Sequence, residues 1–86
     1  MIKHFIVRSG IGFTLEKCET LKEGTNYLRV TAVKLVRMGL EVHRPNWRTL
    51  ICIKKDGSHL KIKLYTVKNE VEEYQLINRT GIYSRL

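Results

Sequence analysis

The 86-residue chain has no long apolar run, only two cysteines and a single proline. Its apolar stretches are far shorter than the roughly 20 residues of a membrane-spanning helix, and Met1-Ile2-Lys3-His4 is not the start expected of a signal peptide. Cys18 and Cys52 lack the close spacing of a zinc knuckle or a redox pair, and no histidine is near either in sequence. We therefore expect a soluble, cytoplasmic protein without a structural metal or a cofactor.

The composition is that of one small globular domain. Apolar residues make up 43% and charged residues 28% of the chain, a mixture without the signature of disorder or of a disulfide scaffold. A chain of this length should bury roughly 60 to 65% of the surface that its unfolded form exposes. We expect residues 1–86 to form a single domain with one modest core.

Acidic residues are scarce in the middle of the chain. The net charge is +8, and residues 24–68 account for all of it, because they hold ten bases and only two acids. Such a concentrated positive field favours polyanionic partners, although it could also serve only to keep the surface soluble. We expect the partner to be DNA or RNA or an acidic protein surface, and not a membrane.

The first half of the chain predicts two strands and a helix. β-prone runs over 3–8 and 11–17 flank Ser9-Gly10, a pair suited to a tight turn. Leucine and alanine then recur at near-helical spacing after Thr25, an N-cap candidate, until Gly39. This pattern predicts an amphipathic helix over about residues 26 to 38, and a short strand ahead of Pro45 should follow it.

The clearest expected element is a hairpin over residues 50–67. Asp56-Gly57 predicts a two-residue turn, which would pair Lys54 with His59 and Ile53 with Leu60. This register divides the hairpin into an apolar face, to be covered by the helix, and a polar face. The apolar face would hold Ile51, Ile53, Leu60, Ile62 and Leu64, and the polar face Leu50, Cys52, Lys54, His59, Lys61, Lys63 and Tyr65.

The segment after Lys68 allows two structures. Asn69 followed by Glu72 could open a helix through a capping box, whereas residues 74–77 and 82–83 could pair as a last hairpin. We favour the hairpin. The predicted fold is then α+β, an antiparallel or mixed sheet of four to six strands with one amphipathic helix packed on one face.

About half of the chain follows the order helix, Gly, strand, Pro, then a hairpin whose second strand ends near a Thr. The segments that carry this order are 32–45, 50–57 and 60–66. In it the chain resembles the small PD-(D/E)xK endonuclease-like domains. That family uses a carboxylate at the start of the first hairpin strand, and an acid or Gln two residues before a Lys on the second, to hold a divalent cation that activates water.

The positions that match this motif hold other residues here. Thr49 stands in place of the first carboxylate, Lys63 in place of the second acid and Tyr65 in place of the lysine. The predicted register also sends Thr49 to the apolar face, so the match would need a β-bulge. The resemblance therefore implies a binding scaffold that has lost the metal chemistry and kept a surface for nucleic acid.

A metal-free ribonuclease is the rival enzymatic hypothesis. His59 beside Lys61, with His43 on another strand, supplies the acid, the base and the cation that phosphodiester cleavage uses. Gly57-Ser58-His59 on a hairpin is also similar to a segment of small RNase toxins with a dsRNA-binding-like fold. Ser58 itself is expected to be a turn residue.

The favoured function is non-catalytic binding of nucleic acid through the outer arc of the helix and the polar face of the hairpin. Trp47 and Tyr65 lie among the basic residues Arg44, Arg48, Lys61 and Lys63. The two rings could stack on nucleobases while the basic side chains neutralise phosphates. Trp47 could instead cap the core. The predicted binding residues are Arg29, Lys34, Arg37, Arg44, Trp47, Arg48, Lys54, His59, Lys61, Lys63 and Tyr65.

The alternative from another class is a protein-protein module. A small regulator or inhibitor of this charge would dock on an acidic partner, or pair with it or with a second copy of the chain through an exposed strand edge.

Overall fold

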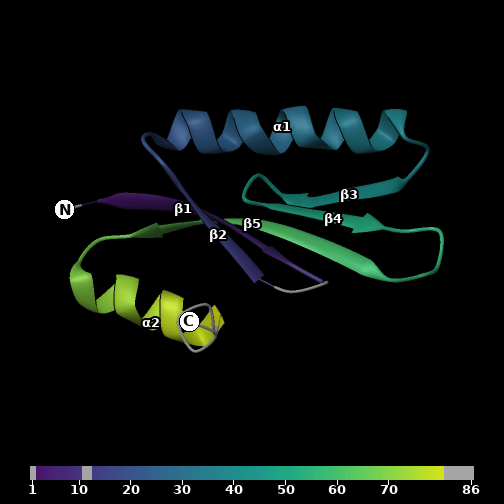
Figure 1. Ribbon diagram of the computed structural model, residues 1–86. Helices are drawn as coiled ribbons and strands as arrows, with labels where there is room; N and C mark the ends of the chain where they lie inside the picture. Colours follow the sequence, from purple (N-terminus) through teal and green to yellow (C-terminus); the bar gives the residue numbers. More distant parts are fainter. Residues whose placement is uncertain (1, 11–12, 81–86) are drawn as a thin grey trace.

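The computed structural model describes residues 2–10 and 13–80, which form a five-stranded antiparallel sheet with a helix on each face (Figure 1). The strand order is β2-β1-β5-β4-β3. The predicted α+β class and strand number are confirmed, and a second helix joins the predicted one. The elements are β1 (Lys3–Ser9), β2 (Phe13–Cys18), α1 (Leu21–Arg37), β3 (Glu41–Asn46), β4 (Thr49–Ile53), β5 (His59–Val67) and α2 (Glu70–Thr80).

α1 packs on one face of the sheet through the larger of two core clusters. Leu28 comes from the middle of the helix and is completely buried. Neither α1 nor α2 combines the length and the apolar character that a membrane-spanning helix needs. The cluster consists of Ile6, Cys18, Leu28, Leu50, Cys52, Ile62 and Leu64.

α1 starts earlier than the sequence pattern predicted. Its N-cap is Thr20, whose hydroxyl accepts a hydrogen bond from the Glu23 N–H at 3.1 Å, so the predicted start after Thr25 is wrong. The polar segment 19–24 resembled a loop, yet Lys22 and Glu23 are good helix formers and complete a first turn. The extra turn adds Lys22 to the outer surface of the helix.

The end of α1 agrees with the prediction. Gly39 adopts a positive φ of 81°, and its N–H donates to the Val36 carbonyl at 2.9 Å. The Leu40 N–H donates to the Leu35 carbonyl at 3.1 Å, which completes a Schellman motif. The chain therefore leaves the helix in a fixed direction and runs back along the sheet as β3.

α2 covers part of the opposite face, and the predicted C-terminal hairpin is wrong. Asn69 Oδ1 accepts from the Glu72 N–H at 2.9 Å, and the Glu72 carboxylate accepts from the Lys68 N–H at 2.6 Å. These two bonds start a helix in the manner of a capping box, the alternative that the sequence offered. Residues 82–83 lie outside the described part of the chain. The cluster beneath α2 consists of Phe5, Val7, Val67 and Leu76.

The loop between β4 and β5 has three residues instead of the predicted two. The Lys54 N–H donates to the Ser58 carbonyl at 2.8 Å, and the Gly57 N–H donates to the Lys54 carbonyl at 2.9 Å. Gly57 has a φ of 86°, which suits the left-handed position that closes such a loop. Ser58 is a turn residue, as predicted. Its N–H and hydroxyl donate to Asp56 Oδ1, and these hydrogen bonds lower the pKa of the Asp56 carboxyl.

The longer loop shifts the register of the hairpin by one residue. Ile53 pairs with His59 and Leu50 with Ile62, so the faces predicted for β5 are correct and those predicted for β4 are reversed. Leu50 and Cys52 are buried beneath α1, whereas Ile51 and Ile53 are half-buried on the other face. A slip of one residue exchanges the two faces of a strand because side chains alternate along it.

This register predicts that neighbouring residues of β4 differ in their effect on stability. Leu50→Ala should lower the free energy of unfolding by about 2 to 5 kcal/mol, because it removes a fully buried side chain from the core. Ile51→Ala should cost clearly less, because Ile51 is half-buried. Urea denaturation measures both values. A larger loss of unfolding free energy in Ile51→Ala than in Leu50→Ala would contradict this register and favour the one predicted with a two-residue turn.

Thiol labelling is an independent test of the same register. Cys52 is completely buried and Cys18 nearly so, and burial, with smaller contributions from Glu23 and Glu16, raises the pKa of the Cys18 thiol. A thiol reagent should therefore modify the native protein slowly and the unfolded protein fast. Rapid labelling of Cys52 in the native state would indicate that its side chain lies on the lysine-bearing face of the hairpin, as the two-residue turn predicted.

Candidate nucleic-acid interface

The predicted binding residues separate onto two faces of the sheet. Arg29 and Arg37 lie on α1, near Arg44 and Trp47 of the β3–β4 segment. Lys61 and Lys63 alternate along β5 with side chains that pack beneath α1, so they point to the opposite face. The helix arc and the hairpin lysines therefore form two distinct surfaces.

A groove runs between α1 and β3 and consists of two hollows that share Arg44. We call it the α1–β3 groove. From Lys22 to Arg37 it follows about 22 Å of helix, at 1.5 Å per residue. The first hollow, of about 390 Å³, is lined by Lys22, Thr25, Asn26, Arg29, Arg44 and Trp47. The second, of about 430 Å³, is lined by Ala32, Val33, Val36, Arg37, Val42 and Arg44.

The charge of the α1–β3 groove is entirely positive among its described lining residues. Lys22, Arg29, Arg37 and Arg44 are its ionic side chains, and no carboxylate stands among them. The ion pairs between described residues, Lys3 with Glu73 and His43 with Glu41, involve none of the four. The groove therefore presents an uncompensated positive field to the solvent.

The β3–β4 turn fixes the aromatic residue of the groove. The Arg44 guanidinium donates to the carbonyl oxygens of Thr49 at 3.1 Å and Trp47 at 3.2 Å. The Arg48 guanidinium lies over the Trp47 ring, 4.3 Å from its centroid. Trp47 is 50% exposed and belongs to neither core cluster, so it borders the groove and does not cap the core.

Other predicted residues stand apart from the groove. Lys34 is exposed on α1 without lining either hollow, and Lys54 is half-buried at the end of the β4–β5 hairpin. Lys22 is a groove residue that the sequence pattern missed, because the helix was predicted to start after it. The spacing of Lys22, Asn26 and Arg29 would have placed them on one helix face had the N-cap been recognised.

The face opposite α1 gathers the residues of both enzymatic hypotheses. Thr49 lies directly opposite Lys63, on the same face as Tyr65, so the expected bulge is not needed to bring the three together. The Lys63 ammonium lies 5.1 Å from the centroid of the Tyr65 ring. These positions thus form one cluster, in which neither Thr49, Lys63 nor Tyr65 offers a carboxylate.

The histidines of the ribonuclease hypothesis share this face. His43 is opposite Ile51, and Ile51 is opposite Lys61, so His43 and Lys61 belong to one cross-strand row. His43 Nε2 is 2.6 Å from Glu41 Oε2. His59 lies in the adjacent row, opposite Ile53. His43 and His59 are both exposed.

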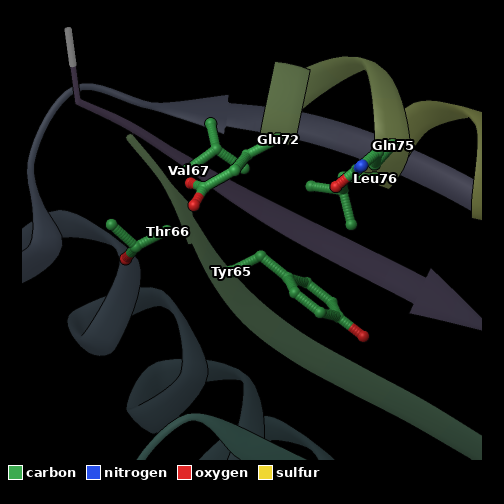
Figure 2. Close-up of a pocket in the computed structure, with 6 residues that line it drawn as sticks. All are labelled: Tyr65, Thr66, Val67, Glu72, Gln75 and Leu76. Atoms are coloured by element: carbon green, nitrogen blue, oxygen red, sulfur yellow. The ribbon is translucent and has the colours of Figure 1, made fainter. Parts of the chain in front are cut away.

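A third hollow lies between β5 and α2 (Figure 2). Its volume is about 260 Å³, and Tyr65 is the predicted binding residue that it contains. Figure 2 shows the Glu72 carboxylate between Thr66 and Val67 at one end and the Tyr65 ring at the other. With a carboxylate and no basic side chain in its described lining, this hollow is less suited to a polyanion than the α1–β3 groove.

Comparison of the chain with protein families, with curated proteins and with solved structures found no match. Across residues 2–10 and 13–80, no three His, Cys, Asp or Glu side chains gather as metal ligands would. The assignment of a candidate site therefore rests on the geometry of this chain alone.

The cluster of Thr49, Lys63 and Tyr65 predicts no metal-dependent nuclease activity. A hard divalent cation needs oxygen ligands of negative charge, and Lys63 would repel it. Magnesium or manganese should leave labelled DNA and RNA intact on a gel. Cleavage that requires either cation and stops with a chelator would show that acids elsewhere in the chain bind a metal. Cleavage of RNA in the presence of chelator, lost in His59→Ala, would support the ribonuclease hypothesis instead.

Proposed function

We propose that the protein binds nucleic acid without catalysis and holds the phosphate backbone in the α1–β3 groove. The observation that carries the proposal is the lining of this groove. Four basic side chains stand there beside a half-exposed tryptophan, and no carboxylate is among the described lining residues. Basic side chains that neutralise phosphates release the counterions condensed on the nucleic acid, and this release drives binding. We expect micromolar affinity at low salt.

The groove bases differ in how firmly the fold holds them. Arg44 is held by two carbonyl oxygens of the β3–β4 turn, so its charge has a set position at the junction of the two hollows. Arg29 donates to Asn26 Oδ1 at 2.7 Å, and Lys22 and Arg37 are exposed at the two ends. A charge held by the turn and flanked by charges on exposed side chains suits a phosphate backbone that runs along the groove.

An acidic protein partner is the second candidate, since β3 is an exposed edge strand. Strand addition to this edge is hindered by Pro45, which has no N–H to donate, and by the register shift between His43 and Asn46. Proline and irregular pairing are features that protect edge strands from pairing. These features count against strand addition at the β3 edge, whereas β2 forms the other edge of the sheet.

Two double variants with equal loss of charge test which face binds. Arg29→Ala with Arg37→Ala removes two groove charges, and Lys61→Ala with Lys63→Ala removes two charges from the opposite face. The groove variant should bind labelled DNA and RNA more weakly, and its salt slope should flatten by about two units. The lysine variant should change both quantities less. Titrations from about 50 mM salt upward measure affinity and slope.

Each other result has a defined meaning. Failure of the wild-type protein to bind DNA or RNA at low salt would end the proposal. A larger loss in the lysine variant would move the interface to the face opposite α1. Both variants should keep their stability within about 1 kcal/mol, because the four side chains lie outside the core. Circular dichroism and urea denaturation check this condition.

A further inference from the structure

We propose that the α1–β3 groove selects single-stranded nucleic acid by stacking an unpaired base on the Trp47 indole. This inference rests on the proposed function and specifies its ligand. It concerns the first hollow, where Trp47 stands with Lys22, Arg29 and Arg44.

Trp47 is held as a ready platform. It occupies a two-residue turn whose flanking residues, Asn46 and Thr49, pair with each other. Its carbonyl accepts from Arg44, and Asn46 Oδ1 accepts from the N–H of Arg48 at 2.9 Å. A turn whose backbone is held before binding loses less conformational entropy than a free loop would when a nucleobase stacks on its side chain.

Arg48 supports the platform from one side. Its guanidinium covers the indole at 4.3 Å, and Nη1 donates to Thr66 Oγ1 at 3.2 Å. Trp47 belongs to the lining of the first hollow and Arg48 does not, and the proposal places the base on the indole face that the guanidinium leaves uncovered. A base in the hollow would stack on indole already backed by a cation.

The second hollow suits a neighbouring base better than a row of phosphates. Beyond Arg44 the lining is mainly apolar, with Val33, Val36 and Val42, and Arg37 adds the further charge. Bases and sugars of a single strand can contact such a lining, whereas a duplex keeps its bases stacked inside and presents charged backbone. Along the groove the side chains are thus aromatic (Trp47), basic (Arg44), apolar (the three valines) and again basic (Arg37). This order matches a single strand whose nucleobases are splayed apart.

Trp47 is the single tryptophan of the chain, so its fluorescence reports on its own contacts. Oligothymidylate or oligouridylate should quench this fluorescence on binding. A duplex of the same length should bind more weakly and quench little. Inorganic polyphosphate, which carries charge without bases, should bind without quenching.

Variants of Trp47 separate stacking from charge. Trp47→Ala should weaken binding of the single strand about 5- to 150-fold, the range for the loss of one stacked base, and leave the salt slope unchanged, because no charge is lost. Affinity for polyphosphate should hardly change. Trp47→Phe keeps an aromatic ring and should retain most of the affinity, which also controls for damage to the turn. Fluorescence anisotropy of labelled ligands measures these affinities.

The outcomes distinguish the inference from the proposed function. Equal or tighter binding of duplex, without quenching and with no effect of Trp47→Ala, would overturn single-strand selection and leave nucleic-acid binding intact. An equal loss in Trp47→Phe and Trp47→Ala would also count against stacking. If neither the single strand nor the duplex binds at low salt, whether or not polyphosphate does, the proposed function fails as well.

Discussion

Leu28 of α1 has no exposed surface, and it lies in the same buried cluster as Leu50, Ile62 and Leu64 of the central strands. Burial of one such leucine contributes about 1.5 to 3 kcal/mol, a substantial share of the stability of a small domain. This contact fixes which side of α1 faces the sheet, and therefore which residues remain on its flank. Because β3, which lies beneath α1 (Figure 1), is the last strand of the sheet, the groove beside it is open to solvent, and Arg29 and Arg37 are exposed there. The α1–β3 groove is thus a consequence of core packing beside a sheet edge.

The distribution of charge follows from the same arrangement. Acidic side chains concentrate on α2 and near the start of α1, and the Lys3–Glu73 ion pair, at 2.9 Å, links β1 to α2. A partly exposed pair of this kind adds little stability, so the fold does not depend on balancing its charges locally. The basic side chains of the groove can therefore remain without ion-pair partners at little cost to the stability of the fold. Their field is then available to an external anion.

The limits of sequence reasoning are clearest in the β4–β5 hairpin. β5 alternates apolar and basic residues, so its two faces were assigned correctly from periodicity alone. After Thr49, β4 reads Leu50-Ile51-Cys52-Ile53, apolar at each of these positions, and either face could have been the buried one. Asp56-Gly57 is compatible with loops of two or three residues, and the backbone bonds between Lys54 and Ser58 decide between them. The capping residues Asn69 and Glu72 did signal α2, and the competing hairpin pattern outweighed them.

The candidate site shows a similar division between charge and placement. A count of bases along residues 24–68 found Arg29, Arg37 and Arg44, but it could not distinguish a surface of scattered charges from a groove. Distance in the sequence separates Trp47 from Arg29, and only the packing of α1 beside β3 brings them to one hollow. Charge alone would attract any polyanion. The combination of basic side chains with an indole beside Arg44 and Arg48 is more selective, because a single strand offers a phosphate and a flat, unstacked nucleobase at every nucleotide. It is this juxtaposition, more than the net charge, on which our proposal of nucleic acid as the partner of the groove rests.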